Sequence, residues 1–304
     1  MSASIIVIHQ AVLMFKEATL YSPVIKNEHG RVSVIFAKDH PGCQDRPYQE
    51  HRARIADLAL RHKPDEPAPD IPYTEAEHET WRTVSAELSA KHRVHACREF
   101  IDASEQLDLR HDRLPQLSEV SARVQPLTGF TFGPAAGLVA QRDFYGSLAD
   151  RRFQATQYIR HPSFPRFSPE PDMIHEVVGH GTHLSSNRWA TLYELLGKTV
   201  RRLESDEAVS LVSRVFWFTI EYGLVIEDGR TKACGASLLS SCGEMDYFLG
   251  ADIHPFDAAA MGRQGYLVEK YQPVLFRAES FNHFEDFLSE FLTSIDDDSE
   301  LIAA

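Results

Sequence analysis

The sequence predicts a mainly α-helical single domain with small β elements. Long segments repeat apolar side chains at a spacing of three and four, as helices with a buried face do. The first segment of the chain is instead rich in β-branched residues, which favour strands. With 304 residues, 43% of them hydrophobic, the chain can bury a large core without disulfide or metal staples.

Residues 1–38 are expected to form a β-rich segment packed on the core. An apolar run, IIVIHQAVLMF, precedes LYSPVIKNEHGRVSVIF, in which the polar KNEHG between two β-branched stretches predicts a hairpin. The apolar run lacks a basic flank and a cleavage site and is too short to span a bilayer. We therefore expect neither a signal peptide nor a membrane segment.

The rest of the chain, 39–304, is predicted to be one helical domain. Helical periodicity runs through YQEHRARIADLALRHK, YTEAEHETWRTVSAELSAKH and AVSLVSRVFWFTIEYGLVI. Two proline-rich loops, 64–72 and 160–172, interrupt the helices. Since helical pattern resumes at once on both sides of each loop, neither is interpreted as a linker between domains.

Charge and cysteine content exclude some classes of protein. A formal net charge of −13 with dispersed basic residues argues against a nucleic-acid partner, which requires a concentrated basic surface. Four scattered cysteines without a CxxC pair indicate reduced thiols. We therefore expect a cytoplasmic protein.

The stretch PEPDMIHEVVGHGTH, residues 169–183, contains a candidate metal site. Asp172 can cap a helix that starts near Met173, and the glycines at 179 and 181 predict its end after about two turns. His175 and His180 are five residues apart, roughly 140° around an ideal helix, unlike the i, i+4 histidines of HExxH zinc proteases. Both can reach one ion only if the helix unwinds near His180; otherwise they are a core residue and a helix-end residue without a ligand.

Glu221 is the second candidate, because its helix is apolar almost all round and is expected to be buried. An isolated ionised carboxylate there costs several kcal/mol unless a positive group compensates it. The alternative is an edge position from which the side chain reaches water. Two histidines and one carboxylate fit either catalytic zinc or the facial triad of non-haem iron(II) oxygenases.

Several motifs together resemble one known family, the pterin-dependent aromatic amino acid hydroxylases. The resemblance is carried by FQATQYIRHPSFPRFSPEPDMIHEVVGH, VFWFTIEYGLV and KACGASLLSSCGEMDYFL. Earlier pieces fall in the family's order: DHPGCQD, YTEAEHETWRTV, HACREF, LPQLSEVS and GLVAQRDFYGSLADRRF. The similarity runs from about Asp39 to about Phe291. It implies that 39–304 is an iron- and pterin-dependent catalytic domain with the family's fold.

The resemblance also implies cofactors and the residues that bind them. His175, His180 and Glu221 match the family's iron(II) ligands. Phe144 matches the aromatic residue on which the tetrahydropterin stacks, Gly137, Leu138 and Val139 the backbone that bonds the pterin edge, and Glu176 the acidic residue beside pterin and iron-bound water. Dioxygen is the co-substrate, of which one atom goes to the pterin and the other to an aromatic ring.

The substrate side of the site follows by the same resemblance. Arg160 matches the arginine that holds the carboxylate of the amino acid, and Asp172 would orient it. Ser168 and Ser240 match positions that hold the amino acid or orient an iron ligand. Trp217 matches a wall of the ring pocket, with Glu244 behind it.

Departures from the family pattern concern specificity and assembly. The segment GTHLSSNRW after His180 differs from the animal enzymes, Ser237 replaces a usual glycine at the ring pocket, and Tyr222 stands where phenylalanine is common.

By the same resemblance, Trp217 favours phenylalanine or tyrosine over tryptophan as the substrate, so we expect L-phenylalanine hydroxylated at the para or meta carbon. The alternatives are a hydroxylase of tryptophan or another aromatic acid, or a zinc hydrolase with Glu176 as base. Without a recognisable tetramerisation helix, a monomer or dimer is expected rather than the animal-type tetramer.

Overall fold

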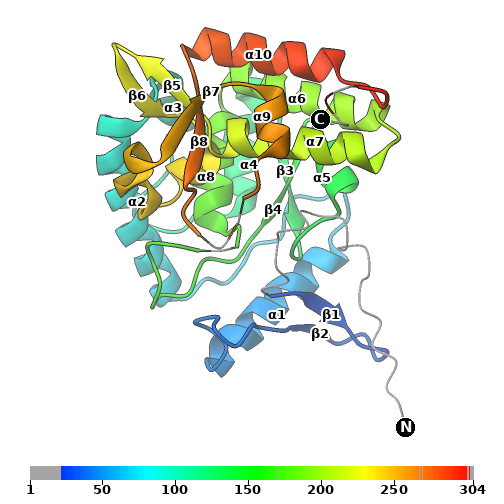
Figure 1. Ribbon diagram of the computed structural model, residues 1–304. Helices are drawn as coiled ribbons and strands as arrows, with labels where there is room; N and C mark the ends of the chain where they lie inside the picture. The colour runs from blue at the N-terminus through cyan, green and yellow to red at the C-terminus, as the bar shows by residue number, and fades with distance from the viewer. Residues whose placement is uncertain (1–21, 169, 267, 269, 300, 302–304) are drawn as a thin grey trace.

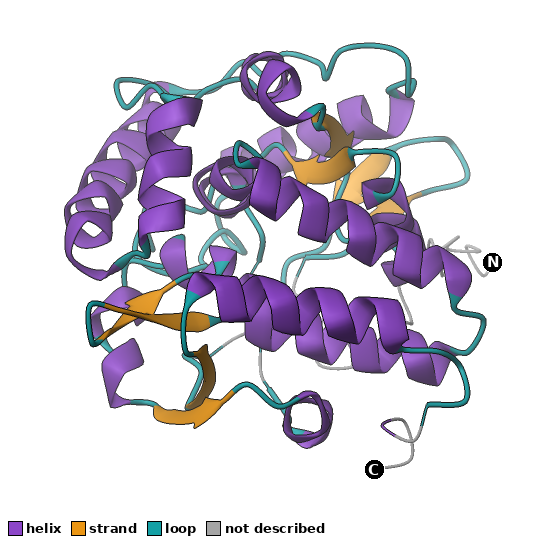
Figure 2. Ribbon diagram, turned by 90° about the horizontal axis from the view of Figure 1, so that it is seen from above, coloured by secondary structure: helices purple, strands orange, loops and turns teal. Residues whose placement is uncertain are grey.

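The computed structural model describes residues 22–168, 170–266, 268, 270–299 and 301, most of them in helices, with short strands between the helices and at the edges of the molecule (Figures 1 and 2). The apolar run at 5–15 therefore lies outside the described residues. The α-helices are α1 (Arg46–Arg61), α2 (Glu75–His95), α3 (Arg98–Leu107), α4 (Leu117–Thr128), α5 (Gln141–Leu148), α6 (Asn187–Arg202), α7 (Asp206–Phe216), α8 (Ala236–Leu239), α9 (Ala258–Arg263) and α10 (Phe281–Ser294). The mainly helical fold predicted from the sequence is confirmed.

Local signals in the sequence explain where the first long helices begin. At the start of α1 the Asp45 side chain accepts the backbone N–H of Tyr48. Thr74 and Glu77 form a reciprocal capping box at the start of α2, which satisfies two backbone donors. Both helices confirm segments that apolar periodicity predicts.

The strands form three small sheets. In the first, β1 (Val24–Lys26) pairs antiparallel with β2 (Val32–Val34), which confirms the hairpin. In the second, β3 (Thr131–Ala135) runs parallel to β4 (Arg152–Thr156). The third has the order β6 (Arg230–Ala233), β5 (Leu224–Glu227), β8 (Val274–Ala278), β7 (Asp252–Pro255).

One predicted helix is too long. The pattern over 208–226 predicts a single helix, but α7 passes into a π-helix, η3 (Trp217–Glu221), and Leu224 already belongs to β5. Gly223 stands at this change of direction. The chain passes so close to the Thr219 carbonyl oxygen there that a Cβ would lie 2.4 Å from it, so only glycine fits. Leu224 and Val225 are fully buried between β6 and β8, so an apolar run that continues the helical pattern serves the sheet instead.

The arrangement of the elements places the hairpin and α1 on one side of the molecule and α10 on the opposite side (Figure 1). Between them lies the main hydrophobic core, to which α2, α6 and α7 contribute their buried faces, and a second small cluster joins Ile55, Ile71 and Tyr158. Its largest fully buried side chains include Trp81, Trp189, Tyr193 and Phe218. A second π-helix, η2 (Ile174–Gly181), and the short α8 cross this core and carry the polar residues described next.

Candidate active site

Three predicted metal ligands converge in the core. The Nε2 atoms of His175 and His180 are 2.9 Å apart, and Glu221 places one oxygen 3.2 Å from His180 Nε2 and the other 4.0 Å from His175 Nε2. One potential ligand atom from each of the three lies within 4.8 Å of the others. His180 and Glu221 are buried and His175 is nearly so. The structure thus brings together the three residues named from the sequence.

A π-helix, rather than an unwound helix end, allows the spacing of five. In η2 the backbone hydrogen bonds join residues i and i+5, so His175 and His180 point from the same face. The predicted stop at Gly179 and Gly181 is therefore wrong, because the helical path continues past Gly181. Glu221 also ends a π-helix, in which the Tyr222 N–H bonds the Trp217 carbonyl at 2.9 Å.

Two glycines bring a third element against both π-helices. A Cβ on Gly179 would lie 2.7 Å from the backbone oxygen of Ala236, and one on Gly235 would lie 2.3 Å from the backbone of Glu221. Any side chain at these positions would push α8 away from η2 or from Glu221. The glycines of the two motifs therefore permit close approach of backbones.

Each ligand is held by a hydroxyl group on its outer side. Tyr193 Oη lies 2.7 Å from His180 Nδ1, and Ser240 Oγ lies 3.3 Å from His175 Nδ1. Ser237 Oγ donates to Glu221 Oε2 at 2.7 Å. Outer hydrogen bonds of this kind orient metal-binding side chains and fix which ring nitrogen stays free for the ion.

The electrostatics of the three residues suit a cation. Burial lowers the pKa of His175 to about 4, which keeps its ring neutral and able to coordinate. Burial alone would raise the pKa of Glu221, but the interactions with the His180 and His175 rings and the hydrogen bond from Ser237 lower it to about 2. Neutral imidazoles and an ionised carboxylate are the forms that bind metal ions.

Glu176 lies beside the cluster formed by His175, His180 and Glu221, on the same π-helix as the two histidines. Its Oε1 accepts the backbone N–H and the hydroxyl of Thr156 at 3.0 Å each, at the end of β4. Burial nevertheless raises the pKa of Glu176 to about 7. This carboxyl group is thus fixed in position next to His175.

Arg160 and Asp172 form a buried pair with a fork geometry. The Arg160 Nε and Nη2 groups donate to the two Asp172 oxygens at 2.8 Å each, and Nη1 donates to the Pro165 carbonyl at 3.3 Å. Asp172 also accepts the Arg160 backbone N–H at 2.7 Å and that of His175 at 3.3 Å. Asp172 therefore caps the start of the helix as predicted and orients the guanidinium group at the same time.

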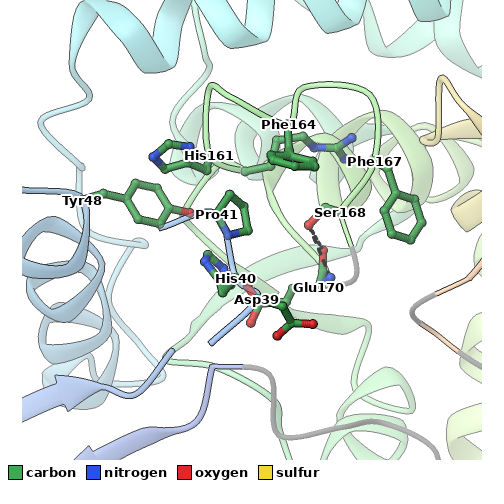
Figure 3. Close-up of a pocket in the computed structure, with 10 residues that line it drawn as sticks. Asp39, His40, Pro41, Tyr48, His161, Phe164, Phe167, Ser168 and Glu170 are labelled. Carbon is green, nitrogen blue, oxygen red and sulfur yellow. Dashed lines mark hydrogen bonds and ion pairs between the residues drawn. The ribbon is translucent and has the colours of Figure 1, made fainter. Parts of the chain in front are cut away.

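A cavity of about 180 Å³ adjoins Arg160 and Ser168 (Figure 3). Tyr48 and Phe167 lie on opposite sides of it in Figure 3, and the Ser168 hydroxyl donates to the Glu170 carbonyl at 2.8 Å. The remaining lining residues are Asp39, His40, Pro41, His161, Phe164 and Glu170. The three predicted metal ligands do not line this cavity, so it touches only the arginine end of the site.

Phe144 is connected to the cluster through one other ring. It is half-buried on α5 and meets Phe153 edge to face at 5.4 Å, while Phe153 lies 4.7 Å from the His180 ring. Residues 137–139 form the loop between β3 and α5, with Gly137 and Val139 partly buried and Leu138 exposed. Phe144 is thus separated from His180 by the Phe153 ring, and the 137–139 loop leads into the helix that carries Phe144.

On the other side of Glu221, aromatic rings form a wall. Trp217 stacks on Tyr266 at 4.2 Å with 14° between the rings, and Tyr222 lies 4.8 Å from it. The Tyr222 hydroxyl donates to Glu244 at 3.3 Å, and Glu244 also accepts the backbone N–H of Gln272 at 3.0 Å. The two predicted outer residues, Tyr222 and Glu244, therefore bond each other behind Trp217.

Sequence reasoning missed three residues that touch the site. Tyr193 lies thirteen residues after His180 on α6, Thr156 ends β4, and Tyr266 follows α9. No spacing rule connects them to the ligands, since their proximity depends on how α6, the β3–β4 sheet and the C-terminal segment pack. The only signal in the sequence was the segment GTHLSSNRW after His180, which departs from the family pattern. It contains His183, which forms a hydrogen bond with Tyr193.

Fold and site together define the class of metalloenzyme in which two histidines and a carboxylate are placed so that they could hold one metal ion. The chain belongs to the biopterin-dependent aromatic amino acid hydroxylase family, which it matches over residues 26–302. It is an iron-dependent monooxygenase with a pterin cofactor, and the match does not support a zinc hydrolase.

Relatives of known name agree with this assignment. The chain is 44% identical over 260 residues to phenylalanine 3-hydroxylase of Streptomyces coeruleorubidus, which covers 86% of this chain and 93% of that protein. It is 42% identical over 263 residues to tyrosine 3-monooxygenase of Bos taurus, covering 84% of this chain but only 53% of the bovine protein.

Solved structures show the same fold. Phenylalanine hydroxylase of Chromobacterium violaceum with bound iron(III) and 7,8-dihydrobiopterin matches with a TM-score of 0.72 and 27% identity over 79% of this chain and 90% of that chain. The cold-active phenylalanine hydroxylase of Colwellia psychrerythraea 34H matches with a TM-score of 0.70 and 28% identity over 80% and 92%. Within the described residues, no helix combines the length and apolar character needed to cross a membrane.

Proposed function

We propose that this enzyme hydroxylates the ring of L-phenylalanine at the meta carbon. The relative that shares 44% identity over nearly its whole length is a phenylalanine 3-hydroxylase, and Trp217 supplies a pocket wall suited to a single six-membered ring. When bound, the tetrahydropterin would supply the two electrons needed to split dioxygen at iron(II), with one oxygen atom going to the pterin and the other to the ring. The residues of this chain bind, orient and shield the reactants.

The observation that carries the proposal for an amino acid substrate is the hydrogen-bond count of Arg160. A guanidinium group has five N–H donors, and three of them bond described residues, Asp172 twice and Pro165 once. Within the described residues, one N–H on each terminal nitrogen has no acceptor. A carboxylate can accept N–H groups from both terminal nitrogens of a guanidinium group, so we assign the carboxylate of the substrate to these two nitrogens.

The other roles follow from the same assignment. We assign iron(II) to His175, His180 and Glu221, whose donor set and outer hydroxyl partners fit a facial site. Phe144 would stack on the pterin, and the backbone of 137–139 would bond its edge. Glu176, fixed by Thr156, would accept a pterin N–H or hold water at the ion.

Specificity is assigned to the residues between the two anchors. Arg160 fixes the head of the amino acid and Trp217 its ring, so the distance between them selects the carbon that reacts. Ser168 would contribute at the carboxylate end and Ser240 at His175. Ser237 would narrow the ring pocket while it holds Glu221.

We further propose that the enzyme works in the cytoplasm as a monomer or dimer, with residues 1–38 as an edge added to a catalytic domain at 39–304. The free thiols of Cys97 and Cys234, with sulfur atoms 3.4 Å apart, are compatible with a reducing compartment. Light scattering during gel filtration would measure the oligomeric state, and a tetramer would contradict this part of the proposal.

Reconstitution tests the reaction directly. Protein loaded with iron(II) without oxygen receives tetrahydropterin, then oxygen with phenylalanine, tyrosine and tryptophan in competition, and products are separated by chromatography and mass. The expected product is meta-hydroxyphenylalanine, formed only with pterin. Formation of ordinary tyrosine would overturn the ring position, and pterin oxidation without any hydroxylated amino acid would overturn the substrate class.

A further inference from the structure

We infer that Tyr193 is a positioning residue that fixes the tautomer of His180 through a hydrogen-bonded chain ending at the backbone carbonyl of Cys234. The inference rests on the proposed iron site. The Tyr193 oxygen lies 2.7 Å from His180 Nδ1 and 3.1 Å from His183 Nδ1, so one hydroxyl joins two imidazole rings. His183 Nε2 lies 2.9 Å from the carbonyl oxygen of Cys234.

The carbonyl group determines the direction of every bond in this chain. A carbonyl oxygen can only accept, so His183 must carry its proton on Nε2. His183 is fully buried with no carboxylate bonded to its ring among the described residues, which favours the neutral form with a lone pair on Nδ1. That lone pair accepts the Tyr193 O–H, and the Tyr193 oxygen is then free to accept from His180 Nδ1–H.

The consequence at His180 is a fixed donor atom. With its proton on Nδ1, His180 keeps the lone pair of Nε2 for the ion, and Nε2 is the nitrogen that faces His175 and Glu221. Without the Tyr193 hydroxyl the ring could place its proton on either nitrogen. Molecules in which the His180 ring carries its proton on Nε2 would have to release that proton from Nε2 before the nitrogen could bind a metal ion.

The chain is rigid as well as directional. The His183 ring stacks on Trp189 at 3.9 Å with 5° between the planes, and Trp189 meets Phe281 and Phe284 at 5.0 and 5.1 Å. The His183, Trp189 and Tyr193 side chains are fully buried. A hydroxyl bonded to a ring that cannot turn holds its own lone pair in one place.

The other histidine ligand shows the same logic in a shorter form. Ser240 Oγ donates to the Ser237 carbonyl at 3.0 Å, which leaves its oxygen to accept from His175 Nδ1–H at 3.3 Å. In both cases a chain of hydrogen bonds that starts at the hydroxyl group ends at a backbone carbonyl. Ser240 donates to the Ser237 carbonyl directly, whereas Tyr193 donates to His183, which donates to the Cys234 carbonyl.

The test combines a spectroscopic measurement with metal affinity. Long-range proton–nitrogen NMR of the metal-free protein labelled with ¹⁵N-histidine shows which ring nitrogen of each histidine carries the proton. We expect His180 protonated on Nδ1 and His183 on Nε2 in the wild type. In Tyr193→Phe, which removes only the hydroxyl, signals of His180 protonated on Nε2 should appear.

Metal affinity supplies the second reading, by anaerobic titration with iron(II) against a competing chelator. Tyr193→Phe should weaken binding about 10- to 100-fold, the usual effect of losing an outer partner of a ligand. His183→Phe keeps a flat ring on Trp189 but removes the acceptor, and should weaken binding in the same direction. Tyr145→Phe is the matched control, because its buried hydroxyl bonds Ser213 at 3.0 Å and no proposed ligand.

The outcomes separate this inference from the proposed reaction. A wild-type spectrum with His180 protonated on Nε2 would overturn the inference even if no variant folded. A folded Tyr193→Phe protein that binds iron(II) as tightly as Tyr145→Phe would also overturn it. Neither measurement uses an amino acid or a pterin, so a wrong substrate assignment would leave both results intact.

Discussion

Replacing Glu244 by Gln should remove a stability cost that appears only as the pH rises. Glu244 is buried behind the Trp217 wall, where it faces the titratable Tyr222, the backbone N–H of Gln272 and the Ser241 hydroxyl. Burial raises the pKa of Glu244 from its ordinary value of 4.5 to about 7. No positively charged partner of its carboxylate is found among the described residues.

The sign and size of the effect follow from this pKa. A carboxyl group with a folded pKa above its unfolded pKa binds its proton more tightly when folded, so its contribution is fully present below pH 4.5 and is lost as the pH rises through about 7. Since one pKa unit corresponds to about 1.4 kcal/mol, the loss approaches about 3 kcal/mol at pH 8. Glutamine has no proton to lose and retains a carbonyl oxygen for the Gln272 N–H.

Equilibrium unfolding in urea of the metal-free protein at pH 5, 6, 7 and 8 measures the effect. The free energy of unfolding of Glu244→Gln minus that of the wild type should increase by up to about 3 kcal/mol between pH 5 and 8. Glu105→Gln on the exposed side of α3 is the control and should change stability by less than about 0.5 kcal/mol at each pH. A Glu244→Gln difference that stays constant with pH would refute the reasoning.

Four further substitutions test individual assignments. Trp217→Phe should enlarge the ring pocket and raise relative activity on tryptophan; an unchanged product ratio in competition would contradict the pocket assignment. Arg160→Lys keeps the charge but loses the fork on Asp172, so KM for the amino acid should rise about 10- to 100-fold in steady-state kinetics, and an unchanged KM would count against the carboxylate site. Ser237→Ala should speed iron(II) loss to a chelator by about tenfold, since Glu221 loses its bond at 2.7 Å; wild-type loss would show the bond is dispensable. Glu221→Ala should abolish iron binding by metal analysis, and stoichiometric iron would refute the triad.

Periodicity and composition predict the parts of the fold that depend on neighbours in sequence. The hairpin around KNEHG, the helices that became α1 and α2, and the burial of Glu221 all follow from patterns a few residues long. The three proposed ligands were also within reach, because a carboxylate in an apolar helix requires a positive partner.

The features that escaped prediction depend on packing between distant segments. A π-helix has no signature in a 3.6-residue pattern, so the spacing of His175 and His180 indicated a helix end instead. Leu224 and Val225 continue an apolar helical run but are taken by the sheet. Tyr193 reaches His180 only because the fold brings α6 close to η2, which no local pattern encodes.

The π-helix also makes the ligand geometry sensitive to chain length. Deleting a single residue, such as Val177, would give the two histidines the i, i+4 spacing that ordinary α-helical hydrogen bonding places on one face, as in HExxH zinc proteases. Everything after the deletion, including the approach of Gly179 to Ala236, would then rotate by one position. Insertion and deletion of one residue, more than substitution, are thus the changes that would separate this kind of metal centre from its α-helical counterpart.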